Sequence, residues 1–347
     1  LVIVKEAEDA AYFQNSLQNI TGTLEILYFP SSFKNKKNFS QVNSSHIMLR
    51  TEALTKIASG GNKKILVTHA DALFEKVVLS NTLFENTIHI QQAEELDIDA
   101  LLEKFVDYGF EKTDFVYEPG QFAIRGGIVD IYSFGNEKPY RIELFGKEVD
   151  SIRIFNPETQ LSERKLLQVN IIPNIDTQFE ATEKVSLLEF LPSNTVLWIE
   201  DWAYVKERLE QMEEEMDVFL LGKSHEPFDQ NNIPETFEVK KEQPASKGDF
   251  ISARLLEQQL IQKHIIEFGK KTSFNGSAQK ILFNTAPQPA FNRNFSMLIK
   301  DLQEHEKNQY NIFIFADQAR QLERLHSIFS DLKAELQITP IPVSIHE

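Results

Sequence analysis

The chain has 347 residues, 41% of them hydrophobic and 25% charged, which is typical of a folded protein of two to four domains. Its net charge of −16 argues against a general affinity for nucleic-acid phosphates and favours protein partners, although it leaves room for a local basic patch. Cysteine is absent, which excludes disulfides and thiolate metal sites and predicts a cytoplasmic location.

Neither a membrane span nor a signal peptide is expected, because no apolar run approaches the roughly 18 residues that a span requires. The eight histidines form no HExxH pair. The sequence starts at Leu1 without a methionine and finishes in the strand-like run ITPIPVSIHE. We therefore expect a fragment of a longer protein.

Three segments combine a short apolar strand with an amphipathic helix. The strands are expected at Ile65–Val67, Val196–Ile199 and Ile312–Phe315, and Asp201 and Asp317 are expected to cap the helices after the second and third. Such units predict parallel sheets of α/β type. We expect a multidomain α/β fold in which degenerate P-loop-like (RecA-like) lobes flank a smaller domain.

A different pattern lies between the first two of these units. A helix predicted over 51–58 precedes it, and a second helix over 97–108 ends at Gly109. Short strands with turn signals follow, which predicts a small α+β domain with an antiparallel sheet. A polar segment at 224–249 predicts a loop. We expect four domains: a first α/β lobe (1–80), the α+β domain (81–174), a second α/β lobe (175–280) and the start of a small α/β domain (281–347).

Two lysine-containing motifs resemble parts of a phosphate-binding loop. In GKKT at 269–272, His264 stands where such a loop needs a glycine, and Lys271 stands where it needs serine or threonine. SGGNKK at 59–64 precedes a strand instead of following one, so we interpret Gly60 as the end of a helix.

The acids of VLWIED resemble the metal-orienting acid of a nucleotidase. Glu200 and Asp201 follow an apolar strand, but no phosphate loop accompanies them, and helix capping explains Asp201 better. We therefore expect no catalytic residue, no cofactor site, no metal site and no enzymatic activity in this chain.

The segment FAIRGGIVDIY, residues 122–132, places an arginine and two glycines within an apolar run. Alternate residues of a strand face opposite sides, so Phe122 and Ile124 share one face. If that face packs on the helix of 97–108, the opposite, outer face presents four side chains: Arg125, Arg141, Glu143 and Phe145.

This outer set predicts a protein interface, because aromatic and arginine side chains carry much of the energy of interfaces. Gly126 and Gly127 suit a bulge or a close backbone approach, which would redirect Arg125. We expect substitutions of Arg125, Arg141 and Phe145 to leave folding nearly unchanged, since their side chains would point away from the core. The alternative is a bent edge strand with one exposed phenylalanine.

The segment from Tyr108 to Pro173 resembles the module shared by the repair protein UvrB and the transcription-repair coupling factors, the Mfd family. The matching motifs are PGQFAIRGGIVDIY, PYRIELFGKEVDSIR and FNPETQLS. The coupling factors fit better, because Ala123 stands where UvrB usually has arginine. The long tyrosine-rich DNA hairpin of UvrB also has no counterpart before residue 51, and no helicase motif follows the middle domain.

The resemblance implies that this region is similar to UvrB without its ATPase and that the middle domain docks UvrA. It places Arg125, Arg141 and Phe145 in that contact, with Glu143 beside them. The chain would then be a monomeric UvrA-recruiting module without a cofactor. In the full-length protein, motor domains that are missing here would bind ATP and Mg, translocate on DNA and dislodge stalled RNA polymerase, which links the stall to nucleotide excision repair.

Two alternatives stay open at this point. The first is a UvrB-type, ATP-dependent damaged-DNA-binding repair protein whose phosphate loop lies in a truncated part. The second is a DNA-binding module, which the net charge disfavours.

Overall fold

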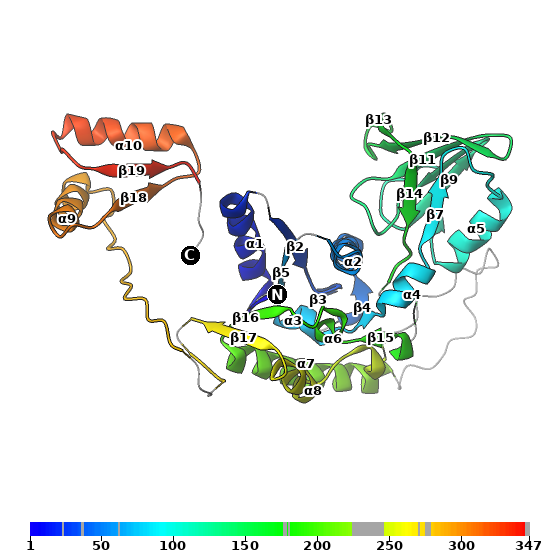
Figure 1. The fold of residues 1–347 in the computed structure, drawn as a ribbon, viewed down its shortest axis with the longest axis horizontal. Coiled ribbons are helices and arrows are strands. Elements are labelled where there is room, and N and C mark those ends of the chain that lie inside the picture. Colours follow the sequence, from blue (N-terminus) through cyan, green and yellow to red (C-terminus); the bar gives the residue numbers. More distant parts are fainter. Residues whose placement is uncertain are drawn as a thin grey trace. The chain divides into compact units, whose positions relative to one another are not determined.

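The computed structural model describes the chain except residues 23, 36–37, 62, 176–178, 180, 224–245, 270, 275–278 and 344–347. The chain divides into two compact units, Leu1–Gln14 with Leu24–Phe274, and Asn15–Thr23 with Asn275–Glu347. The first unit contains a parallel sheet and a separate antiparallel sheet (Figure 1). In the described part of the chain, no helix has the length and apolar character needed to cross a membrane.

The parallel sheet has five strands in the order β17-β16-β1-β5-β2. They are β1 (Val2–Val4), β2 (Glu25–Phe29), β5 (Lys64–His69), β16 (Val196–Glu200) and β17 (His264–Phe268). The strands predicted at 65–67 and 196–199 are confirmed as parts of β5 and β16.

The two flanking segments build one sheet, which corrects the expectation of separate lobes on either side of the middle domain. The apolar strand β1 pairs with β5 on one side and with β16 on the other. A strand that is buried on both faces needs such partners at both edges for its backbone groups. The segments before and after the middle domain are therefore joined through β1.

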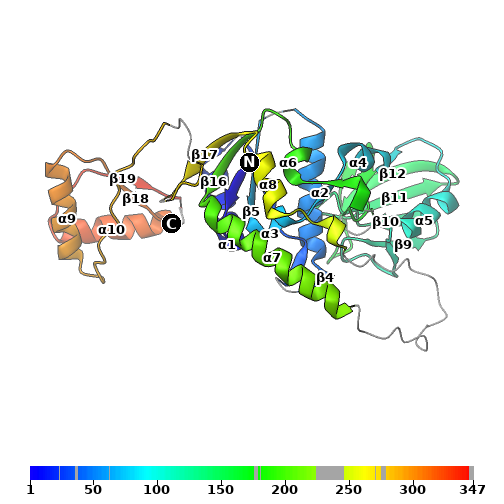
Figure 2. The same ribbon diagram turned by 90° about the horizontal axis from the view of Figure 1, so that it is seen from below.

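Helices accompany this sheet, and α7 lies along α3 and α8 (Figures 1 and 2). They are α1 (Ala7–Thr21), α2 (Ser44–Ala58), α3 (Ala70–Phe74), α4 (Ser80–Glu85), α6 (Leu187–Phe190), α7 (Trp202–Lys223) and α8 (Ala253–Leu260). Short strand pairs complete the unit: β3 (Phe33–Asn35) with β4 (Asn38–Val42), and β6 (Val77–Val78) with β15 (Lys184–Val185).

Local capping explains where two helices begin. Helix α2 begins at Ser44 rather than at Thr51, because the Asn43 side chain accepts hydrogen bonds from the backbone N–H groups of Ser45 and His46. The Asp201 carboxylate accepts from the Tyr204 N–H at 3.3 Å, as predicted for a cap.

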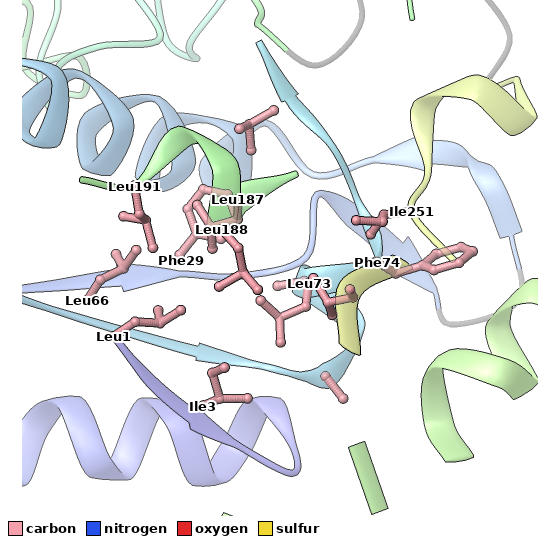
Figure 3. Packing of buried hydrophobic residues seen from close by; sticks show 14 of the residues in the cluster. Leu1, Ile3, Phe29, Leu66, Leu73, Phe74, Leu187, Leu188, Leu191 and Ile251 are labelled. Carbon is pink, nitrogen blue, oxygen red and sulfur yellow. The ribbon is translucent and has the colours of Figure 1, made fainter. Parts of the chain in front are cut away.

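The core of the parallel sheet draws on both flanking segments (Figure 3). Leu1, Phe29 and Leu66 come from the first segment, whereas Leu187 and Leu191 come from the second, and all five are buried in one cluster. Burial of each large apolar side chain stabilises the fold by about 1.5–3 kcal/mol. The two segments consequently fold as one structure.

The antiparallel sheet has the strand order β13-β12-β11-β10-β9-β8. Its strands are β8 (Glu111–Lys112), β9 (Gln121–Arg125), β10 (Ile128–Ile131), β11 (Tyr140–Phe145), β12 (Glu148–Phe155) and β13 (Ser162–Leu166). Only the short pair β8–β9 is parallel. A second ladder pairs β7 (Ile88–Gln91) with β14 (Gln168–Ile171).

Helix α5 (Ile98–Asp107) covers the inner face of this sheet, as the sequence predicted. Leu101 and Phe105 are buried in one cluster with Phe122 of β9, and Gly109 follows the helix with φ 74°. Ile47 of α2 is also buried in this cluster. The middle domain therefore shares part of its core with the parallel-sheet domain.

The second unit contains α9 (Phe295–Lys307), β18 (Ile312–Phe315), α10 (Ala319–Asp331) and β19 (Ile338–Ile341), with β18 and β19 paired in parallel. The strand predicted at 312–315 is confirmed. The predicted cap is wrong, because the capping position of α10 is Gln318, which leaves Asp317 one residue too early.

Two sequence predictions fall partly on residues outside the described ranges. The predicted loop at 224–249 includes 224–245, and its remainder contains the short 3₁₀ helix η2 (Lys247–Asp249). The GKKT motif includes residue 270.

Candidate protein-docking site

The sheet register brings the predicted polar residues onto one face of the middle domain. Residues that lie opposite each other in an antiparallel pair share a face. Ile128 lies opposite both Arg125 on β9 and Glu143 on β11, and Asp130 lies opposite Arg141. Arg125, Arg141 and Glu143 therefore share the outer face that alternation predicted.

A buried carboxylate, Asp130, joins the two arginines. Its side chain is 1% exposed, and it accepts a hydrogen bond from Nη2 of Arg125. Arg141 binds it in a bidentate manner, with Nε donating to Oδ1 and Nη2 to Oδ2, each at 2.8 Å. Charge-assisted bidentate pairs of this kind are the strongest hydrogen bonds in proteins.

Most of the Arg141 side chain is in contact with other residues of the chain. Its side chain is 14% exposed, its Nη1 donates to the Gln160 carbonyl at 3.1 Å, and its guanidinium lies 4.5 Å from the centre of the Phe155 ring. The hydrogen bond with Asp130 raises the pKa of Arg141 above its ordinary value. Arg141 lies on the outer face as predicted, but the expectation that it points away from the core holds only for the main core, because it packs against Phe155, which belongs to a small apolar cluster with Val116.

Arg125 is more accessible and has an aromatic neighbour. Its side chain is 37% exposed, its Nη1 donates to the Asp114 carbonyl at 3.2 Å, and its guanidinium lies 4.9 Å from the centre of the Phe115 ring. The Phe115 and Tyr117 rings lie 6.5 Å apart, and each is about half exposed. This side of the outer face therefore presents a cation beside two rings.

Glu143 and Phe145 complete the predicted set. The Ser151 hydroxyl donates to Glu143 at 2.5 Å, and Nη2 of Arg153 lies 3.2 Å from the same carboxylate. Phe145, at the end of β11, is 84% exposed. A ring with this exposure contributes little to the core, and it is available for an apolar contact with a partner.

The two glycines form a turn with a close backbone approach, which was one of the two predicted alternatives, and the other alternative, a bulge at these residues, is wrong. Arg125 pairs directly with Ile128, so Gly126 and Gly127 are the two-residue connection between β9 and β10. Gly126 has φ 62°, and a Cβ added to Gly127 would lie 2.9 Å from the Leu144 carbonyl oxygen. The register shift lies instead between Glu143 and Leu144. Gly127 thus lets the turn approach the irregular part of β11.

Sequence reasoning missed three residues of this face: Asp130, Phe115 and Tyr117. Alternation along β10 places Asp130 on the outer face, and an acid between two arginines was the available signal. No periodic signal marks Phe115 and Tyr117, because they precede β9 outside any regular strand.

A second group of charges lies at the carboxyl edge of the parallel sheet. Lys5 forms an ion pair with Glu200 at 2.8 Å, and this hydrogen bond raises the pKa of Lys5. Nε of Arg208 on α7 lies 2.7 Å from Asp71 on α3. No group of three or more metal-ligating side chains is arranged around a common point in the described part of the chain.

Comparison with known proteins assigns the middle domain. Residues 88–176 match the UvrB interaction domain family. Over 94% of its length, the chain is 24% identical to the transcription-repair-coupling factor of Bacillus subtilis. Over 99% of its length, it is 26% identical to the transcription-repair-coupling factor of Borreliella burgdorferi. The chain spans about one third of the length of these two relatives, 32% in each case.

The fold and this match define a UvrB interaction domain attached to a parallel α/β domain. Along nearly its whole length the chain is similar to the transcription-repair-coupling factors, as the sequence resemblance indicated. A shorter match, 31% identical over 53% of the chain, is found with the coupling factor of Staphylococcus aureus strain RF122.

Proposed function

We propose that the chain is a docking module that binds UvrA through the outer face of its six-stranded sheet. The observation that carries the proposal is an exposed aromatic ring, Phe145, on the same face as an arginine network fixed by Asp130. Aromatic and arginine side chains are enriched among the residues that dominate binding energy. The match of this domain to the UvrB interaction domain supports the proposal.

The three predicted contact residues have different roles in this proposal. Arg125 offers its accessible guanidinium to a carboxylate of UvrA, and Phe145 enters an apolar pocket. Arg141 has little free surface, so it supports the face more than it extends the contact. Glu143 orients Arg153 at the border of the face.

In a full-length coupling factor, this docking would bring UvrA to a stalled RNA polymerase and link transcription to nucleotide excision repair. The name of the relatives supports the coupling role. ATP-dependent translocation on DNA would belong to motor domains in the remaining two thirds of such a protein, and ATP and Mg would bind there.

We also propose that this chain is not an enzyme and does not bind a nucleotide. α/β folds bind phosphates where a glycine-rich loop leads from a strand into a helix N-terminus. Here the central strand β1 enters α1 through Lys5 and Glu6 without a glycine, and Glu8 and Asp9 occupy the first turn of α1. These carboxylates repel a phosphate, which disfavours a nucleotide site at this loop.

The UvrA proposal is tested by measuring the affinity of UvrA for the complete 347-residue chain, its Arg125→Ala variant and its Phe145→Ala variant. Lys104→Ala is the matched control, because Lys104 lies on α5, which covers the opposite face of the sheet. We expect the first two variants to bind UvrA more weakly and the control to bind normally. Unchanged binding in both variants would refute the docking face.

A further inference from the structure

Asp130 is buried at a position where an ionised carboxylate is energetically unfavourable unless charged partners and hydrogen bonds compensate for the loss of water. It is buried in the middle of the sheet, between Ala123 on β9 and Arg141 on β11. An ionised carboxylate that is removed from water needs charged partners and hydrogen bonds. Arg141 alone supplies a bidentate pair, yet Arg125 also turns towards this carboxylate.

The additional bond has a consequence for Arg125. An exposed arginine side chain exchanges freely among several rotamers. A partner that immobilises it reduces its conformational entropy, which is unfavourable for binding. Asp130, the Asp114 carbonyl and the Phe115 ring hold the guanidinium from three directions. Asp130 is the charged member of the three, so it provides the strongest restraint.

We infer that Asp130 is the positioning residue of the docking face: it holds Arg125 against Phe115 in the orientation in which the guanidinium meets the partner. This inference rests on the proposed function. Asp130 itself is buried, so it offers almost no surface to a partner. Its effect on binding passes through Arg125.

The same network defines the chemistry of the partner surface. Asp130 neutralises one of the two arginine charges, so the network presents a single surplus positive charge next to Phe115 and Tyr117. The complementary element is one carboxylate within an apolar surface. A cluster of acids would leave carboxylates unpaired in the contact, which is unfavourable.

Two double-mutant cycles on the complete chain test the positioning role, with UvrA affinity as the measurement. Asp130→Asn retains the shape of the side chain and removes its charge, and we expect it to weaken binding about tenfold. In the Arg125→Ala background the same change should cost less than about twofold, because its effect is already lost. In the Phe145→Ala background it should keep its full effect.

Melting temperatures are measured for all variants, in order to establish that each variant is folded when its binding is measured. Additive losses for Asp130→Asn and Arg125→Ala would overturn the inference, because Asp130 would then act independently of Arg125. If Phe145→Ala weakens binding and Asp130→Asn does not, the docking face stands and the positioning role is wrong. If neither Phe145→Ala nor Arg125→Ala weakens binding, the proposed function itself fails.

Salt dependence tests the chemistry of the partner. With one carboxylate facing one surplus cation, raising NaCl from about 50 to about 500 mM should weaken UvrA binding only a few-fold. A loss of about a hundredfold or more would overturn the single-carboxylate description.

Discussion

The carboxyl edge of the parallel sheet and the outer face of the antiparallel sheet both carry charged networks, but the balance of charge differs. At the edge, Lys5 and Arg208 each contact a carboxylate of another element, and these pairs join β1 to β16 and α3 to α7. On the outer face, two arginines share Asp130, and Phe145 stands exposed. Balanced pairs hold elements of the fold together, whereas a surplus cation on a face that also has an exposed ring favours recognition of a partner.

The largest expected effect is a difference in stability between alanine substitutions of the two arginines of the outer face. Arg141→Ala should lower the free energy of unfolding by about 3 kcal/mol, because it removes the bidentate partner of a buried carboxylate. Arg125→Ala should cost only about 0–1 kcal/mol, since Arg125 is partly solvated. Thermal melts with hydrogen exchange of the β10 and β11 amides measure both. Equal losses would show that the two arginines have the same structural role.

Phe145→Ala should weaken UvrA binding by about 2 kcal/mol, which is about 30-fold, without changing the melting temperature. The reason is that the ring is exposed in the free chain and would be buried only in the complex. Leu167→Ala is the control, because Leu167 is also exposed on the middle domain. A lower melting temperature with normal binding would mean that the ring stabilises the fold and not the complex.

Gly127→Ala tests whether the turn controls the end of β11. The new Cβ would press on the Leu144 carbonyl, so we expect a loss of about 1–2 kcal/mol in stability and weaker UvrA binding through a displaced Phe145. Gly126→Ala meets no atom within 4 Å, so only the strain of its positive φ, about 1 kcal/mol, should remain. Equal UvrA affinities in the two variants would show that the geometry of this turn does not affect UvrA binding.

The smallest effects are expected at the edge of the parallel sheet. Glu200→Gln should lower stability by about 0–1 kcal/mol and leave UvrA affinity unchanged, because the pair with Lys5 is partly exposed and lies outside the middle domain. Calorimetry with Mg-ATP should give no binding for either form of the chain. Micromolar binding of Mg-ATP would contradict the proposal that this edge has no nucleotide site.

Local patterns predicted the elements and the faces of this protein well. The strands β5, β16 and β18 and the helix α5 follow from apolar runs and their capping residues, and alternation placed Arg125, Arg141 and Glu143 on one face. Alternation states which way a side chain points, but it contains no information on how deeply neighbours cover it. The burial of Arg141 against Phe155 and Asp130 was therefore not predictable from spacing.

The pairing of strands that are far apart in the sequence was the other feature that local patterns did not predict. β1 and β16 are neighbours in the sheet although most of the chain's first two hundred residues separate them, and no local signal records such a pairing. The two flanking segments consequently looked like separate lobes. The start of α2 was missed for a local reason, because Asn43 caps a helix whose first turn is polar.

The burial of Ile47 within the middle domain has a mechanical meaning. This side chain belongs to α2, yet it fills the cluster beneath the six-stranded sheet, and neighbouring Met48 packs against Phe155 and its cluster on the other face. Pulling the two sheets apart would open a void at both places. The outer face of the six-stranded sheet is thus linked to the parallel-sheet domain through α2, so a partner bound there would move together with that domain.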